Sequence, residues 1–98
     1  MMYIIRETFI AKPGSAGKLA KLMKEAIPMM GNPKVTIMLD MVTDFNKIVI
    51  EREIESLAAF EKEMEEYKKN PNPEFMEKMK GYTDLYLTGK REIFKVVD

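Results

Sequence analysis

Apolar and polar residues recur along this chain with periods that separate strands from helices. β-Branched and aromatic residues are concentrated over residues 3–11, which predicts a strand that ends at a Lys-Pro-Gly turn. Residues 35–42 alternate between two faces, and residues 47–54 follow after a short turn-rich connection, so these two segments predict a β-hairpin. Residues 85–97 predict the last strand, with a bend or bulge at Gly89.

Between these strands lie two segments with the three- and four-residue spacing of amphipathic helices. We expect Ser15 to cap the first helix and Ser56 to cap the second, while Asn72 and Pro73 begin a short third helix that ends before Gly81. The apolar stripe of the first helix is Leu19, Leu22, Met23, Ala26, Ile27 and Met30, and that of the second is Leu57, Phe60, Met64 and Tyr67.

The order strand, helix, strand, strand, helix, strand predicts an α+β fold of the ferredoxin-like βαββαβ type. Right-handed crossovers place the first and third strands at the centre of a four-stranded antiparallel sheet, with both helices on one face. The 98 residues fit one domain, which we assign to residues 1–98.

The other face of the predicted sheet is half apolar, whereas a solvated sheet face is coated with charged side chains. An apolar surface of this size favours a homodimer in which a second copy covers the face. A one-residue slip or a bulge would instead turn Glu7 and Arg52 toward this face in place of Arg6 and Glu51. The alternation assigns to the open face Ile4, Arg6, Thr8, Ile10, Thr36, Met38, Asp40, Val42, Val49, Glu51, Glu53, Tyr86, Glu92, Phe94 and Val96.

Composition narrows the possible chemistry. Sixteen basic residues balance sixteen acidic ones, so no net field attracts the chain to nucleic acid or to a membrane surface. Cysteine and histidine are both absent, which argues against metal binding, disulfides and imidazole catalysis, and we expect no cofactor. The N-terminal segment reaches a charged residue after five positions, so we expect a soluble cytoplasmic protein without a signal peptide or membrane span.

Several segments resemble the NIPSNAP-like branch of the dimeric α+β barrel superfamily, which also includes the antibiotic-biosynthesis monooxygenases. The segments are Arg6 to Phe9, Lys12 to Gly14, Phe45 to Glu51, Ser56 to Ala58, Asn72 to Phe75 and Gly89 to Phe94. The resemblance implies a protomer whose sheet packs face to face on its copy and encloses a barrel-like space. Members of the superfamily include cofactor-independent monooxygenases, haem-degrading enzymes, muconolactone isomerase-like and chlorite dismutase-like proteins, and many small proteins with no assigned role. This chain has no His and no Trp, which argues against a haem or oxygenase role.

The candidate site is a carboxylate and arginine group on the open face. Enclosed between two sheets, one of several carboxylates would have a raised pKa and act as an acid or base. The alternative interpretation is a set of cross-strand ion pairs in which Arg6 neutralises Glu51. The predicted ligand-binding residues are Arg6, Thr8, Met38, Asp40, Glu51, Glu53 and Tyr86.

Two classes of function fit this sequence. The first is a homodimer that binds a small organic molecule between its sheets, or that is purely structural. The second is a cofactor-independent enzyme, monooxygenase- or isomerase-like, that acts on a small carbonyl or phenolic metabolite. In the enzyme, Glu51, Glu53 or Asp40 would be the base, and Arg6 would stabilise developing negative charge. Because an acid-base enzyme without histidine must shift a carboxylate pKa, the first class is favoured.

Overall fold

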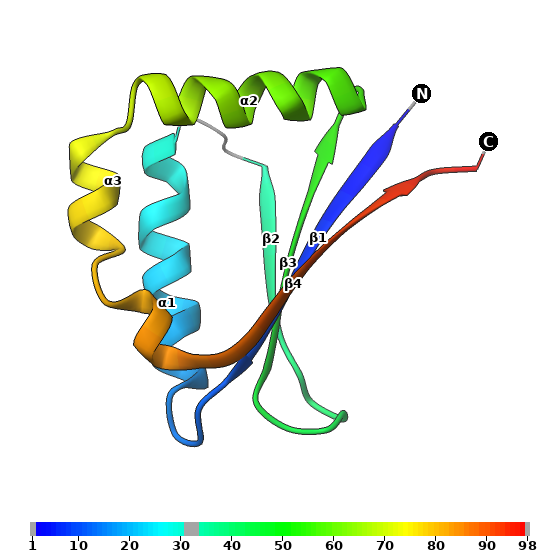
Figure 1. Ribbon diagram of the computed structural model, residues 1–98. Helices are drawn as coiled ribbons and strands as arrows, with labels where there is room; N and C mark the ends of the chain where they lie inside the picture. The colour runs from blue at the N-terminus through cyan, green and yellow to red at the C-terminus, as the bar shows by residue number, and fades with distance from the viewer. Residues whose placement is uncertain (1, 31–33, 98) are drawn as a thin grey trace.

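One antiparallel sheet of four strands organises the chain, and the helices lie on one side of it (Figure 1). The computed structural model describes residues 2–30 and 34–97. The strand order is β2-β3-β1-β4, so the predicted fold class and the predicted central strands are confirmed. The elements are β1 (Tyr3–Ala11), α1 (Ala16–Ala26), β2 (Val35–Leu39), β3 (Lys47–Ile54), α2 (Leu57–Lys69), α3 (Pro73–Lys78) and β4 (Tyr86–Lys95), with 3₁₀ turns at Ile27–Met30 and Tyr82–Leu85.

The core lies between α1 and the two central strands. Leu19 and Met23 of α1 are buried against Ala11 of β1 and against Ile48 and Ile50 of β3, as the helical spacing predicts. Each large aliphatic side chain removed from water in this way contributes roughly 1.5–3 kcal/mol. This single layer of contacts holds α1 along the sheet and leaves the opposite sheet face uncovered.

Helix α2 runs across one end of the same sheet face, and the prediction of a buried stripe along it is wrong (Figure 1). No residue of α2 is buried, and Leu57 is largely exposed. The helix instead contacts charged groups of the sheet, because Arg52 of β3 donates to Glu63 at 3.0 Å and the Arg91 guanidinium lies 5.4 Å from the Phe60 ring centre. Phe60 and Met64 are half-buried, so the predicted stripe is only partly covered. On the sheet, the charged residues that contact α2 lie beside the buried Ile5 and Ile54.

Two of the three predicted helix caps are confirmed. The Ser56 hydroxyl accepts a hydrogen bond from the Ala59 amide at 3.0 Å, and the Asn72 side chain accepts from the Glu74 and Phe75 amides. The Asn72 amide also donates to the Met29 carbonyl at 2.8 Å and so ties α3 to the end of the first helical segment. Ser15 stands at the N-cap position of α1, as predicted, but its side chain makes no capping hydrogen bond, so this cap is confirmed in position only.

The irregularity of the last strand lies away from Gly89, where the sequence placed it. The register between β1 and β4 shifts between Ile10 and Ala11, which face Thr88 and Tyr86 respectively. Gly89 pairs with Phe9, and a Cβ at Gly89 would lie 3.0 Å from two carbons of that ring. The glycine therefore makes room for an aromatic side chain of the neighbouring strand.

Strand β2 ends at Leu39, three residues earlier than the alternation predicts. Residues 40–46 form the hairpin loop instead, and Phe45 and Asn46 both have positive φ angles, of 83° and 54°. Val42 therefore lies in the loop and not on the open face of the sheet.

Candidate functional site

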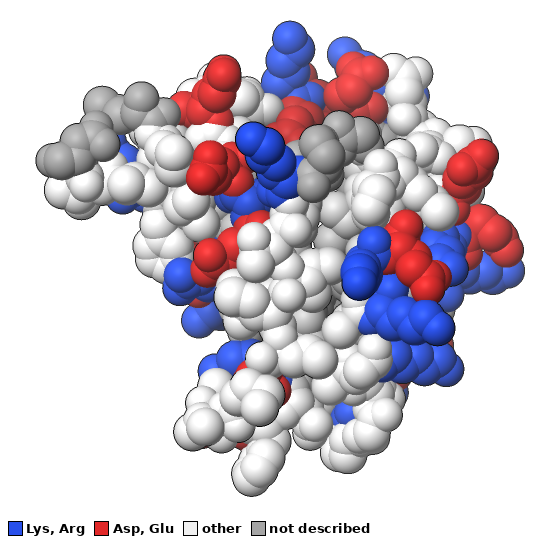
Figure 2. Space-filling model, turned by 180° about the vertical axis from the view of Figure 1, so that it is seen from behind, with Lys and Arg blue, Asp and Glu red and all other residues white. Residues whose placement is uncertain are grey.

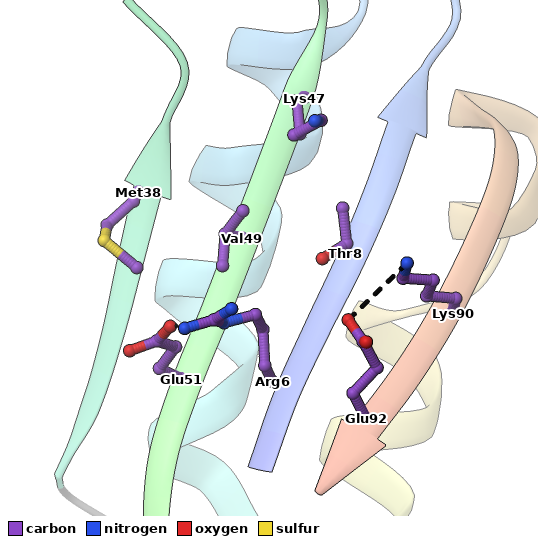
Figure 3. A pocket seen from close by; sticks show the side chains of 8 residues that line it. All are labelled: Arg6, Thr8, Met38, Lys47, Val49, Glu51, Lys90 and Glu92. Atoms are coloured by element: carbon purple, nitrogen blue, oxygen red, sulfur yellow. Dashed lines mark hydrogen bonds and ion pairs between the residues drawn. The ribbon is translucent and has the colours of Figure 1, made fainter. Parts of the chain in front are cut away.

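The open face of the sheet carries a cavity of about 400 Å³ (Figure 3). Register fixes its composition, because Arg6 of β1 lies opposite both Glu51 of β3 and Glu92 of β4. One step further along, Thr8 lies between Val49 and Lys90. The lining residues are Arg6, Thr8, Met38, Lys47, Val49, Glu51, Lys90 and Glu92.

An ion pair lies at one end of this cavity. The Arg6 Nε donates to Glu51 Oε2 at 2.6 Å, and the Arg6 guanidinium lies 5.1 Å from the centre of the Phe94 ring. The alternative parity, with Glu7 and Arg52 on the open face, is wrong. Both of those side chains lie on the helix side of the sheet, where they pair with Arg91 and Glu63.

The other end of the cavity is cationic and hydroxylic. Lys47 and Lys90 come from strands on either side of β1, and Thr8 lies between them in Figure 3. The Lys90 ammonium lies 3.6 Å from Glu92, while Val49 and Met38 give one wall an apolar surface. The cavity therefore offers several hydrogen-bond donors beside a short apolar wall, and it is more highly charged than most small-molecule sites.

Sequence reasoning did not include Lys47 and Lys90 in the site. Lys47 lies two residues before Val49, and Lys90 lies two residues before Glu92, so strict alternation places both on the open face. The expected irregularity at Gly89 interrupted that count on the last strand. With the bulge at the start of β4, the alternation runs unbroken through Lys90, and the sequence pattern then places Lys90 on the open face.

Asp40 and Glu53 do not line the cavity, although the sequence placed them in the site. Asp40 closes the hairpin, where its carboxylate accepts hydrogen bonds from the Thr43 hydroxyl and the Lys47 amide. The Thr43 hydrogen bond lowers the pKa of Asp40, so this group is a poor candidate for a base with a raised pKa. Glu53 is exposed and lies opposite Ile4, toward the far end of β3.

The prediction that Tyr86 faces the site is also wrong. The register shift at Ile10 and Ala11 turns Tyr86 to the helix side of the sheet, where its ring centre lies 4.9 Å from that of Phe9. Tyr82 packs beside it at 5.8 Å, and burial raises the pKa of the Tyr82 phenol. These two tyrosines belong to the core.

The described residues contain no obvious place for a metal ion. Within residues 2–30 and 34–97, no three carboxylates come together in a way that could hold one. Across the same residues, every helix is too short or too polar to cross a bilayer. The polar groups that line the cavity are ammonium, guanidinium, carboxylate and hydroxyl groups.

No protein-family model matches the sequence, and a comparison with curated proteins finds no match. Solved structures do share the fold. A NIPSNAP family protein from Agrobacterium tumefaciens str. C58 superposes with a TM-score of 0.82 and 13% identity, over 100% of this chain and 95% of that one. An uncharacterized NIPSNAP domain protein from Burkholderia xenovorans has a TM-score of 0.81 and 9% identity, over 99% and 95% of the two chains.

A third similar structure is a mutant of SnoaB, a cofactor-independent oxygenase from Streptomyces nogalater. It superposes with a TM-score of 0.67 and 12% identity, over 99% of this chain and 94% of that one. The predicted resemblance is confirmed at the level of fold, because this chain has the α+β fold of NIPSNAP family proteins and of an oxygenase that needs no cofactor.

Proposed function

We propose that this protein is a homodimer whose open sheet faces enclose a small organic molecule. The observation that carries the proposal is the uncovered sheet face, on which charged groups surround a cavity while Ile4, Phe94 and Val96 remain unpacked by any helix. A second copy would cover the apolar residues and convert the shallow cavity into an enclosed one.

The lining residues indicate which ligands would fit. Arg6, Lys47 and Lys90 are cations, Glu51 and Glu92 are anions, and Val49 and Met38 supply apolar contact. In the cationic half, the two ammonium groups and the Thr8 hydroxyl suit an acidic or phenolic oxygen. A compact molecule with one such oxygen and a short apolar body matches this arrangement.

The dimer and the ligand are tested by separate measurements. Sedimentation equilibrium at micromolar concentration should give twice the chain mass of 11.4 kDa, and a monomer at that concentration would refute the proposal. Thermal unfolding in the presence of small carboxylic acids, phenols and neutral isosteres should then show stabilisation by a subset of them. The Thr8→Val variant should lose this ligand-dependent shift, whereas Thr83→Val, in the 3₁₀ turn on the other side of the sheet, should retain it.

A purely structural dimer is the competing outcome, and its signature is an interface that side chains fill completely. In that case no compound would shift the midpoint of unfolding, and Thr8→Val would behave like its control.

The second candidate function is a cofactor-independent enzyme acting on a small carbonyl or phenolic metabolite. It is supported by the fold shared with a cofactor-independent oxygenase and by Glu51, which lies in the cavity beside a guanidinium. In this scheme Glu51 would take a proton from the substrate, and Arg6 would stabilise the resulting negative charge. The enzyme is supported if the native chain turns over a substrate and Glu51→Gln abolishes turnover while the dimer persists. The binding protein is supported if neither the native chain nor Glu51→Gln shows turnover and the substitution lowers the stability of the dimer.

A further inference from the structure

The hairpin loop 40–46 exposes three large apolar side chains at its tip. Met41, Val42 and Phe45 are 94%, 92% and 78% exposed, although loops of this kind are normally polar. In Figure 2 the loop projects from the molecule at the lower left, and most of its surface is uncharged. Apolar groups concentrated at one projecting tip indicate a contact surface.

Hydrogen bonds hold this loop in one shape. The Asp40 amide donates to the Lys47 carbonyl at 3.1 Å, the Ala11 amide donates to the Asn46 carbonyl at 2.8 Å, and the Asp40 carboxylate accepts from Thr43. Phe45 has a φ of 83°, a conformation that costs a residue with a side chain on the order of 1–3 kcal/mol. The hydrogen bonds of the loop therefore keep Phe45 in a strained backbone conformation with its ring exposed to water.

A second apolar patch lies at the opposite end of the open face, where β1 begins and β4 ends. Phe94, Val96 and Met2 are exposed there beside the half-buried Ile4, and the Val96 amide donates to the Met2 carbonyl at 2.9 Å. We call these four residues the terminal patch. In Figure 1 the hairpin loop and the end of the sheet where β1 begins and β4 ends both curve away from α1. The open face thus has an apolar patch at each of two opposite ends.

We infer that the two sheets of the proposed dimer pack with their strands antiparallel across the interface, so that the hairpin loop of each copy covers the terminal patch of the other. This inference rests on the homodimer proposed above. Under twofold symmetry one such contact generates a second, identical one, so both patches of both copies are buried. If the loops faced each other instead, their projecting tips would hold the two sheets apart.

The charges of the strands favour the same orientation. On the open face, Lys47 and Lys90 lie in the half nearer the hairpin loop, whereas Glu53 lies in the half nearer the terminal patch. An antiparallel arrangement brings each lysine half over the partner's glutamate half. The parallel arrangement would bring the two lysine halves together, at a cost in repulsion. Asp40 also lies near the loop, but its carboxylate is already bound within the hairpin.

The hairpin loop also adds contact area to the sheet face. Four strands about 4.8 Å apart and about eight residues long cover on the order of 500 Å² as a flat sheet, before the relief of the side chains is counted. A stable interface typically buries roughly 800 Å² of accessible surface on each partner. The loop lies outside the four strands, so its contact with the partner adds to the area that the sheet face supplies.

Cross-linking between introduced cysteines tests the orientation directly, since the chain has no native cysteine. Phe45→Cys and Val96→Cys are purified separately, mixed, allowed to exchange subunits and treated with a short bis-maleimide. The expected result is a covalent dimer in the mixture that exceeds the yield from either variant alone. Lys18→Cys, on the exposed side of α1, replaces Val96→Cys in the control and should give no mixed product with Phe45→Cys.

The outcomes separate the inference from the proposal on which it rests. A dimer that cross-links through Phe45→Cys alone, or that gives no mixed product, would overturn the antiparallel orientation and leave the homodimer standing. A monomer by sedimentation of the native chain would overturn both. A second measurement guards against loss of fold in the cysteine variants. Phe45→Ser should weaken dimerisation at least tenfold, whereas Leu57→Ser, at another exposed apolar position at the start of α2, should leave it unchanged.

Discussion

The pair formed by Arg6 and Glu51 gives a quantitative test of whether the open face is covered in solution. The Arg6 and Glu51 side chains are 42% and 29% exposed in the single chain, and they lie 2.6 Å apart. A pair as exposed as this contributes roughly 0.2–1 kcal/mol, because water and salt screen it. If a second copy covers the face, both groups lose their water, and removing one of them costs roughly 2–5 kcal/mol.

The chain contains a closely matched control. Arg91 and Glu7 lie on the helix side of the same sheet at 3.1 Å, with side-chain exposures of 46% and 26%. Arg91 stacks on Phe60 at 5.4 Å, much as Arg6 stacks on Phe94 at 5.1 Å. The two pairs therefore differ chiefly in the sheet face on which they lie.

The perturbation is a double-mutant cycle on each pair, with Glu to Gln and Arg to Met so that the apolar stem of each arginine is retained. Urea unfolding followed by circular dichroism, at one protein concentration well above the dimer dissociation constant, gives the four free energies of each cycle. We expect a coupling energy above about 1.5 kcal/mol for Arg6 with Glu51 and below about 1 kcal/mol for Arg91 with Glu7. Equal and small coupling in the two cycles would refute the argument that a second copy covers the open face.

Three further predictions concern the fold itself. Leu19→Ala, at a fully buried position, should lower the free energy of unfolding by about 2–5 kcal/mol in urea, and a loss under 1 kcal/mol would contradict the assigned core. Gly89→Ala should destabilise by about 1–3 kcal/mol because the new methyl group meets the Phe9 ring, and the Phe9→Leu background should relieve much of that loss. The hydrogen bond from Thr43 lowers the pKa of Asp40 in the folded state below its ordinary value of 3.8. The stabilisation from this bond is therefore fully present above pH 3.8 and is lost as the pH falls through the lowered pKa. Thr43→Val should therefore be less stable than the native chain at pH 7, with a difference that shrinks on acidification; a difference independent of pH would exclude this role.

The period of the apolar residues was sufficient to predict the class of fold. Strands repeat every two residues and helices every three to four, so the segments 3–11 and 47–54 were identifiable without any knowledge of their neighbours. Strand order followed as well, because the handedness of crossovers leaves few arrangements for this sequence of elements. The ion pair of Arg6 with Glu51 was one of two alternatives that the alternation allowed, and the register selects it.

The remaining features depended on contacts between segments that are distant in the sequence. Tyr86 does not lie on the open face because a bulge opposite Ala11 reverses the alternation of side chains at the start of β4. No local sequence pattern marks the position of that bulge. Asp40 lies outside the site because hydrogen bonds within the hairpin end β2 early. The stripe of α2 is only half-buried because charged residues of the sheet also contact this helix. Alternation along a strand determines which side chains share a face. Which of these side chains meet in one cavity is decided by strand register, bulges and loop closure. These features depend on contacts between residues that are far apart in the sequence, so no local pattern records them.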